Sequence, residues 1–591
     1  MTLVSAPNDG WYMPGGRDAA GDRRAPTPAA PQDRRGRALE VGRSRMVVLG
    51  LFFAVAYTIV GARLADVTLL RSPDDGGTAG RAAPATPAAS MVSRANIVDR
   101  NGVVLATSLA TASVYADPKQ VIDPADTARR LVAVLPDLNY DEVLEKLRGK
   151  GRFVWLKRNL SPTQHYHVHR LGLPGIEFQR EDRRVYPLGS LTSHVVGFTG
   201  VDNNGLAGIE QGYDARLKSS PEPIVLSLDS RIQHIVRKEL QASVEEFRAI
   251  GGSAVVMDVR TGEVISMVSL PDFDPNAPGE AAPETRFNRN TLGVYEMGST
   301  FKIFNSALAF ESGKIRITDS FDATKSIRYG RFSISDYHPE NRWLTVAEIF
   351  EHSSNVGSVK MVQQVGTEGQ KQFMTKIGMT RPVPLELPES GLPLVPKPWR
   401  DINAATISFG HGISVSPMHL VQGTAAMVNG GILHPATLLK RDPANVPGER
   451  VISPQTSDKM RRMMRLVVEK GTGANAEAPG YIVGGKTGTA EKTVGRGYKA
   501  NARLSSFIGA FPINDPKYTI LVMLDEPKGN KRTYGYATGG WVAAPVVSRV
   551  VAQIGPLLGL KPVDSELPEI RSAISIDGKS TPLKQLVSTG R

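Results

Sequence analysis

Residues 253–269, SAVVMDVRTGEVISMVS, decide the fold of the larger part of this chain. Two apolar runs, Ser253–Val259 and Val264–Ser269, are joined by a short polar turn that contains Gly262. Glycine tolerates the left-handed backbone that tight turns need, so the pattern predicts a β-hairpin. Helical periodicity over Arg231–Phe247 predicts a helix directly before it.

Apolar runs recur late in the chain and predict three more strands, at Tyr481–Thr489, Ser505–Phe511 and Tyr518–Asp525. A last helix is predicted at Ala544–Leu558, and most of the intervening sequence has helical character. Strands at both ends of a helical stretch predict an α+β fold. Its core is one antiparallel sheet flanked by helices, with an all-helical subdomain.

Composition and charge exclude several classes of protein. Hydrophobic residues make up 41% of the 591 residues, which excludes a mainly disordered chain. The formal net charge is +13, but the basic residues are dispersed rather than clustered, so no nucleic-acid partner is predicted. Cysteine is absent, which excludes disulfides, thiolate metal sites and a cysteine nucleophile.

The N-terminal region contains an apolar run, Met46–Ala62, that is flanked by arginines. It would extend about 26 Å as a helix, near the lower limit for crossing a bilayer core. We therefore predict a transmembrane helix over 46–64, with the disordered tail 1–45 in the cytoplasm because that tail is net positive. A cleaved signal peptide is the alternative, but 45 residues precede the run, which is unusually many for a signal peptide.

The predicted topology is thus a single-pass protein of the cytoplasmic (inner) membrane with its bulk outside the cytoplasm. Residues 65–90 are rich in Ala, Gly and Pro and predict a flexible linker. Residues 91–222 alternate short strands, turns and helices and are predicted to form one domain, and residues 223–562 a second. Residues 563–591 are predicted to be a loosely ordered C-terminal tail.

The first motif that carries chemistry is Gly298-Ser299-Thr300-Phe301-Lys302, followed by an apolar helical run. Ser299 is predicted to stand at the N-terminus of a buried helix, with Lys302 on the same face one turn later. A desolvated lysine can act as a base toward a serine nucleophile. The S-x-x-K pattern alone is weak, since a chain of this length holds one or two by chance.

The second motif is Ser353-Ser354-Asn355. Thr345 and Glu348 form a capping-box pattern, so a short helix is predicted to start there and to place the motif at its far end. A hydroxyl and an amide two residues apart on a loop can pass a proton and bind a peptide group. By itself the motif is far more typical of a polar turn that ends a helix.

The third motif is Lys486-Thr487-Gly488-Thr489, inside a predicted strand. Strand alternation puts Thr487 and Thr489 on one face. Gly488 is predicted to let a substrate backbone approach closely. Two hydroxyls and a lysine suit a carboxylate ligand.

Two other patterns are misleading. Residues 480–487, GYIVGGKT, match the phosphate-binding loop of nucleotide-binding proteins, but no strand precedes them and Gly488 stands where a helix should begin. His165, His167 and His169 follow a helix N-cap pattern, which would leave two of them on one face without a third ligand. No nucleotide, metal or other cofactor is predicted.

The three motifs occur in the order S-x-x-K, S-x-N, K-T-G, separated by 54 residues (299 to 353) and 133 residues (353 to 486). This set resembles that of the penicillin-binding proteins and serine β-lactamases. Other segments resemble the class B penicillin-binding proteins. Segments similar to their pedestal domain are Arg94, Ile97–Gly102, Arg184–Pro187 and Gly205–Glu210, and segments similar to their transpeptidase domain are Asp274–Asn276 and Asn288–Arg289.

Within class B, the middle motif resembles the septal, FtsI-like branch. The elongation branch commonly has an acidic residue where Asn355 stands, and Asp525-Glu526-Pro527 also looks septal. The resemblance therefore implies an elongated pedestal domain and a D,D-transpeptidase that cross-links septal peptidoglycan during cell division. An elongation-specific enzyme is the alternative. A glycan polymerase of the FtsW type and other division proteins are the implied partners, because no polymerase domain fits into this chain.

The resemblance also implies the catalytic roles. Ser299 attacks the penultimate D-Ala of a D-Ala-D-Ala stem peptide while Lys302 takes its proton. Ser353, with Lys486, relays a proton to the departing D-Ala. Asn355 holds the stem-peptide amide.

The implied substrate-binding residues are Thr487, Gly488 and Thr489, whose two hydroxyls grip the terminal carboxylate. The backbone N–H groups of Ser299 and Thr489 would form the oxyanion hole. β-Lactam antibiotics would acylate the same serine.

Two rival functions share the motifs. A β-lactamase would not need an anchor and pedestal, and a non-catalytic penicillin-binding sensor or scaffold would not need both lysines.

Overall fold

The structure is a computed structural model that describes residues 50–61, 93–330, 332–494 and 497–576. The chain divides into two units, Met1–Ser90 and Met91–Arg591. In the first unit residues 50–61 are helical, and the remainder of the predicted span 46–64, the tail 1–45 and the linker 65–90 lie outside the described residues. None of the described helices has both the length and the apolar character needed to cross a membrane.

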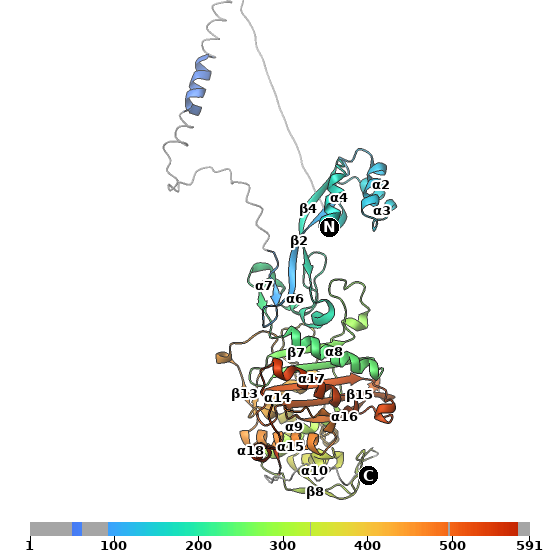
Figure 1. The fold of residues 1–591 in the computed structure, drawn as a ribbon, viewed down its shortest axis with the longest axis vertical. Coiled ribbons are helices and arrows are strands. Elements are labelled where there is room, and N and C mark those ends of the chain that lie inside the picture. The colour runs from blue at the N-terminus through green and yellow to red at the C-terminus, as the bar shows by residue number, and fades with distance from the viewer. Residues whose placement is uncertain (1–49, 62–92, 331, 495–496, 577–591) are drawn as a thin grey trace, which may run out of the picture. The chain divides into compact units, whose positions relative to one another are not determined.

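The core of the second unit is a five-stranded antiparallel sheet, as predicted. Its strands follow the order β14-β15-β16-β6-β7, and every neighbouring pair is antiparallel. In Figure 1 the green strand β7 lies in the same layer as the orange strands β15 and β16, although it is distant from them in sequence. The strand bounds are Gly251–Asp258 (β6), Val264–Leu270 (β7), Gly484–Val494 (β14), Gly497–Phe511 (β15) and Tyr518–Asp525 (β16).

Helices cover both faces of this sheet. Successive residues of β6 point to opposite sides, so that Ala254 and Val256 enter one apolar core and Val255 and Met257 another. The first core contains α8 (Ser230–Glu246) and α17 (Ala544–Leu557). The second contains α9 (Lys302–Glu311), α14 (Pro417–Val428) and α15 (Pro454–Glu469).

The remaining elements of this domain are short. Helices lie at Pro283–Arg286 (η3), Gly298–Phe301 (η4), Val346–Glu351 (α10), Asn355–Val365 (α11), Thr367–Lys376 (α12), Asp401–Ile407 (α13), Pro443–Asn445 (η5), Ala474–Ala476 (η6), Lys531–Thr533 (η7), Gly539–Val542 (α16) and Pro568–Ile574 (α18). Three two-stranded sheets pair Ser320–Asp322 (β8) with Trp343–Thr345 (β11), Ile327–Tyr329 (β9) with Phe332–Ile334 (β10), and Ile432–Leu433 (β12) with Glu449–Arg450 (β13).

Two details differ from the sequence prediction. The strand expected from Tyr481 begins only at Gly484, because Tyr481 and Ile482 pack into the two cores instead. The strand then runs through Lys486 and Thr487, and no helix follows them, unlike in a phosphate-binding loop. The C-terminal tail was expected to be loosely ordered, but α18 forms within it because Ile574 packs into the core and Arg462 binds the carbonyl of Ser575.

Among the described residues, the pedestal contains a second sheet and seven helices. Strand β2 pairs with β1, β3 and β4, and β1 pairs with β5. The strands are Ile97–Val98 (β1), Val104–Ala116 (β2), Val154–Leu160 (β3), Ile176–Val185 (β4) and Ile224–Val225 (β5). The helices are Pro124–Val134 (α2), Tyr140–Leu147 (α3), Pro162–Arg170 (α4), Gly189–Thr192 (η2), Ser193–Val196 (α5), Gly208–Gly212 (α6) and Asp214–Ser219 (α7).

Helix α4 carries the three histidines on a capped helix, as predicted. The capping box joins Ser161 and Gln164. His165 and His169 share a face and both rings contact Phe178. Across the described part of the chain, no group of three metal-ligating side chains is present.

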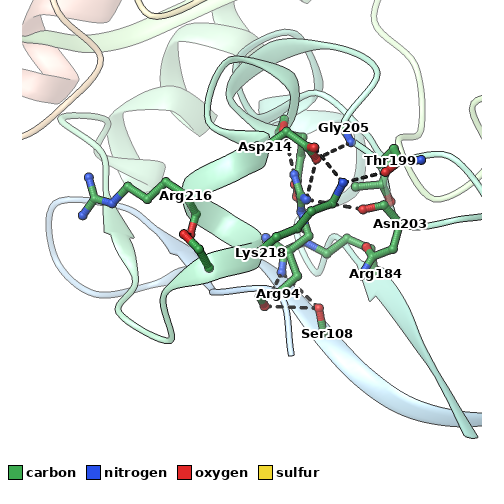
Figure 2. Close-up of polar contacts among 12 residues, drawn as sticks. Arg94, Ser108, Arg184, Thr199, Asn203, Gly205, Asp214, Arg216 and Lys218 are labelled. Carbon is green, nitrogen blue, oxygen red and sulfur yellow. Dashed lines mark hydrogen bonds and ion pairs between the residues drawn. The ribbon is translucent and has the colours of Figure 1, made fainter. Parts of the chain in front are cut away.

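Buried ion pairs join the pedestal segments that the sequence motifs had singled out. Glu210 is fully buried, and its carboxylate accepts one hydrogen bond from Arg94 and one from Arg184, each at 2.6 Å. Figure 2 shows the adjoining Asp214, which binds Arg94 at 2.7 Å, the N–H of Gly205 at 2.8 Å and Lys218 at 2.7 Å. A buried charge is tolerated only when it is paired, so these pairs hold the distant segments together.

Several polar contacts bond the pedestal to the transpeptidase-like domain, and two of its side-chain anchors are Asp99 and Asn276. The buried Asp99 accepts hydrogen bonds from the backbone N–H and the hydroxyl of Ser230, the first residue of α8. Asn276 accepts from the N–H of Tyr186 and donates to its carbonyl. These contacts fix the base of the pedestal to the domain that holds the candidate site.

Candidate functional site

The site lies where the edge strand β14 meets the turn that carries Ser299. The turn is a short 3₁₀ helix, Gly298–Phe301, and α9 begins at Lys302. The α-helix therefore starts later than predicted, although Lys302 still lies one turn after Ser299. Gly298 has φ 56°, and a Cβ there would lie 2.9 Å from the carbonyl oxygen of Thr489. Glycine is needed because the turn packs directly against the strand.

Lys302 connects the first two motifs. Its Nζ lies 3.0 Å from Ser299 Oγ and 3.1 Å from Ser353 Oγ, and it also binds the carbonyl oxygen of Ser353 at 2.7 Å. A fourth contact reaches Asn355 Oδ1 at 2.8 Å. The side chain is fully buried, so these four oxygens are its surroundings in place of water.

Lys486 approaches the same hydroxyl from the strand. Its Nζ lies 3.0 Å from Ser353 Oγ, and its side chain is also fully buried. Burial lowers the pKa of Lys486 to about 7. Burial also lowers the pKa of Lys302 well below its usual value, and the charge of Lys486 lowers it further, while Asp336 opposes the change. Burial therefore favours the neutral form of both amines, and an amine must be neutral to act as a base.

Ser353 is held in an uncommon backbone conformation. Its φ is 62°, in the left-handed region that residues other than glycine rarely adopt. The predicted capping box of Thr345 and Glu348 opens α10, and the motif follows the end of that helix, as expected. Ser354 then caps α11 by accepting from the N–H of Gly357. The hydroxyl of Ser353 is thus fixed between two helices.

Asp336, which sequence reasoning missed, holds the second motif in place. Its carboxylate accepts hydrogen bonds from the hydroxyl of Ser354 at 2.7 Å and from the N–H groups of Asn355 and Val356 at 2.5 and 2.9 Å. The segment around Asp336 has no recognisable pattern, and its contact with α11 is made only in the folded structure. No sequence signal would have identified it.

A cavity of about 560 Å³ opens over these groups. Ser299, Ser353 and Asn355 line one side of it, and Thr487 and Thr489 line the strand side, as alternation predicted. Lys302 and Lys486 are not lining residues, and they contact the lining through Ser299, Ser353 and Asn355. Further lining residues that were not predicted include Asp336, His411, Thr472, Glu491, Arg503, Tyr536 and Trp541.

The two threonines of the third motif are fixed by neighbouring elements. The hydroxyls of Thr487 and Thr472 lie 2.7 Å apart in a hydrogen bond. Thr489 Oγ1 accepts from the N–H of Gly539 at 3.2 Å, at the start of α16. Both hydroxyls face the cavity with their orientation already set.

Gly488 has a packing role in this structure. A Cβ at this position would lie 2.6 Å from Ser506 Oγ and 2.9 Å from the carbonyl oxygen of Met297. Glycine therefore lets the strand pass close to the turn of Ser299, and the residue is not part of the cavity lining. Its predicted contact with a substrate backbone stays a prediction.

His411 marks a second turn that touches the turn of Ser299. The N–H of Gly298 donates to the carbonyl of Gly410, and a Cβ at Gly410 would lie 2.0 Å from the carbonyl oxygen of Gly298. Burial lowers the pKa of His411, although the charge of Glu296 opposes this. The Gly-His-Gly triplet at 410–412 is the sequence signal that would have drawn attention to it.

Comparisons with known proteins agree with these observations. The penicillin binding protein transpeptidase domain matches residues 252–552, and the penicillin-binding protein dimerisation domain matches residues 89–246. The boundary at 222/223 stays a prediction. The chain is 40% identical to the probable peptidoglycan D,D-transpeptidase FtsI of Caulobacter vibrioides, over 79% of this chain and 82% of the relative.

Two further relatives extend the comparison. The peptidoglycan D,D-transpeptidase FtsI of Escherichia coli is 32% identical, over 80% of this chain and 84% of the relative. Among solved structures, penicillin binding protein 3 of Mycobacterium tuberculosis, complexed with aztreonam, matches with a TM-score of 0.63 and 26% identity. That match covers 80% of this chain and 97% of the other.

Proposed function

This chain belongs to the class B penicillin-binding proteins of the septal, FtsI-like type, and from that premise we propose how it works as a peptidoglycan D,D-transpeptidase. It cross-links D-Ala-D-Ala stem peptides through an acyl-enzyme on Ser299. The observation that carries the proposal is the position of the buried Lys302 amine, 3.0 Å from Ser299 Oγ and 3.1 Å from Ser353 Oγ. A neutral amine at that distance is a suitable base for the serine.

In the first step, Lys302 takes the proton of Ser299 as its Oγ attacks the carbonyl carbon of the penultimate D-Ala. The backbone N–H groups of Ser299 and Thr489 stabilise the oxyanion. Thr487 and Thr489 bind the terminal carboxylate, and Asn355 holds the stem-peptide amide.

In the second step, the C–N bond to the last D-Ala breaks, and its nitrogen receives a proton through Ser353, which Lys486 contacts at 3.0 Å. An amine of a neighbouring stem then attacks the acyl-enzyme, loses its proton along the same path and restores Ser299. β-Lactams acylate Ser299 in place of the stem peptide. The aztreonam complex of the mycobacterial relative supports this.

Labelling with a fluorescent penicillin tests the assignment. Ser299→Ala should abolish labelling while the protein stays folded, and Lys302→Ala should reduce the rate roughly 10²–10⁴-fold, the usual contribution of a general base. Cross-linking of lipid-linked glycan strands by the full chain tests the reaction itself. Normal labelling of folded Ser299→Ala would refute the nucleophile, and rapid turnover of nitrocefin would favour a β-lactamase.

We also propose that the chain is anchored in the cytoplasmic membrane by a helix over 46–64, with the catalytic domain outside. The Arg-flanked apolar run supports this. Protease added to spheroplasts should digest the bulk and leave a small N-terminal membrane fragment. A mature N-terminus near residue 63 would indicate a cleaved signal peptide instead.

The proposed place of action is the division septum, beside a glycan polymerase of the FtsW type. Asn355 in the second motif and the similarity to two FtsI proteins support this. Depletion of the protein should block constriction while growth continues, which gives elongated or branched cells. Rounded cells that still divide would favour the elongation branch.

A further inference from the structure

Two opposite charges at the cavity have no role in the mechanism above. Glu491 on β14 and Arg503 on β15 both line the cavity, and they are directly opposite each other in the strand register. Residues paired in this way on one face have Cβ atoms about 5 Å apart. Neither side chain forms a hydrogen bond or an ion pair with another described residue, and Arg503 is the only Lys or Arg among the described residues that line the cavity.

The other carboxylate of the lining is already engaged. Asp336 binds the start of α11 through Ser354, Asn355 and Val356. Glu491 instead acts electrostatically on another lining residue, His411. Its negative charge raises the pKa of His411 and so opposes the lowering that burial causes. Glu491 and Arg503 are thus a charge pair that faces the ligand space.

The position of this pair follows from strand geometry. Thr487, Thr489 and Glu491 alternate along β14 and point to the same face. Glu491 lies roughly 7 Å beyond Thr489, since two residues of a strand extend about that far. Strand β14 is also the edge of the sheet, so its outer side can pair with an extended peptide.

The proposed mechanism fixes the direction of the bound stem peptide. Its terminal carboxylate lies at Thr487 and Thr489, and the attacked carbonyl lies at Ser299 and the N–H of Thr489. The chain preceding the penultimate D-Ala must therefore lead toward Glu491. The third residue of the stem is the next one along this path, and its side chain is the group that reaches the charge pair.

We propose that Glu491 and Arg503 bind the side-chain end of the third residue of the donor stem, and that this end is zwitterionic. Glu491 binds its ammonium group and Arg503 its carboxylate, as a diaminopimelate-type residue would supply. A lysine at the third position offers the ammonium alone and leaves Arg503 facing a cation. The inference rests on the proposed function, because the direction of the stem comes from the transpeptidase site.

Stem-peptide thioesters that differ only in the third residue provide the test. The full chain is assayed with donors that carry diaminopimelate, its side-chain amide or lysine, and kcat/KM is compared. Wild type should prefer diaminopimelate over lysine by roughly threefold to tenfold, the range of one or two partly exposed ion pairs. Arg503→Gln should slow the diaminopimelate donor toward the rate of the amide and leave the lysine donor unchanged.

Glu491→Gln should slow all three donors, because each carries the ammonium group. Acylation by benzylpenicillin, which has no third residue, should stay within about twofold in both variants, since they remove only partly exposed ion pairs. Glu449→Gln, an exposed glutamate in β13, is the matched control and should behave as wild type.

Equal rates for wild type with diaminopimelate and lysine donors would overturn the inference. So would slower penicillin acylation in Arg503→Gln, because Arg503 would then serve the terminal carboxylate. If no donor reacts while penicillin still acylates Ser299, the proposed function fails and this inference fails with it. If all donors react equally, the proposed function stands and only the charge-pair inference is lost.

Discussion

Replacing Asp336 by alanine is the sharpest test of how the second motif is positioned. The carboxylate accepts three hydrogen bonds, from the Ser354 hydroxyl and from the N–H groups of Asn355 and Val356. It forms no hydrogen bond with Ser299 or Lys302, so it acts through Asn355, whose Oδ1 lies 2.8 Å from Lys302 Nζ. Asp336 is therefore a positioning residue.

The expected cost follows from these bonds. A hydrogen bond to a charged acceptor contributes about 1.5–3 kcal/mol, and water in the cavity can replace part of what Asp336→Ala removes, so we expect a loss of about 2–4 kcal/mol in the free energy of unfolding. A shifted Asn355 would no longer hold Lys302 against Ser299. We expect acylation to slow roughly 10- to 100-fold, which corresponds to about 1.4–2.7 kcal/mol in the activation free energy.

The assay is the second-order rate of acylation by a fluorescent penicillin, measured between pH 6 and 9 with thermal melting alongside. Because the charge of Asp336 raises the pKa of Lys302, its removal should move the acid limb of the rate profile to lower pH. Asp336→Asn keeps an oxygen acceptor and should be milder. Asp319→Ala, which removes a carboxylate that accepts the N–H of Arg316, is the matched control in the same subdomain. A folded Asp336→Ala protein with an unchanged rate and unshifted profile would refute the positioning role.

Three further changes test other parts of the structure. Because burial lowers the pKa of Lys486 to about 7, the unfolded chain binds more protons between about pH 7 and 10, so unfolding free energy rises with pH in that window. Lys486→Met should flatten this rise in urea titrations. Glu210→Gln leaves Arg94 and Arg184 buried without their shared counter-ion and should cost roughly 3–5 kcal/mol in thermal or urea unfolding. Gly488→Ala should displace the turn of Ser299 and slow penicillin acylation on the order of 10- to 100-fold.

Each of these has an outcome that contradicts it. An unchanged pH dependence in Lys486→Met would mean that the amine is not desolvated. Asp202→Asn, which removes an exposed partner of Arg158, should cost under about 1 kcal/mol, and an equal loss in Glu210→Gln would remove the case for a buried network. Wild-type acylation in Gly488→Ala would mean that the strand can move away from the turn.

Local patterns predicted the elements well because their causes are local. The hairpin strands expected at Ser253–Val259 and Val264–Ser269 lie at Gly251–Asp258 and Val264–Leu270. The helix expected at Ala544–Leu558 ends one residue earlier, at Leu557. Apolar alternation, helical periodicity and capping residues act within a few positions, and a single sequence contains them in full.

Tertiary contacts could not be predicted from local patterns, because they join residues that are not neighbours in the sequence. The strand expected from Tyr481 starts later because Tyr481 is drawn into a core formed by helices distant in sequence. Gly488 is required by Ser506 and Met297, which belong to another strand and to the turn before Ser299. Asp336 contacts its motif only after folding. In each case the residue that makes the contact belongs to another segment of the chain, so the local sequence pattern does not predict the contact.

The fold brings the lysines of the first and third motifs to the same hydroxyl, that of Ser353. Folding brings Lys302 and Lys486 within 3.1 and 3.0 Å of one hydroxyl, and both side chains are fully buried. Two positive charges this close repel strongly where water is excluded, so the doubly protonated state is disfavoured. One amine can then be neutral and accept the proton of Ser299 while the other is protonated. Ser353 lies between them, where a hydroxyl can accept a proton from one side and donate one to the other, as transfer to a departing D-Ala requires.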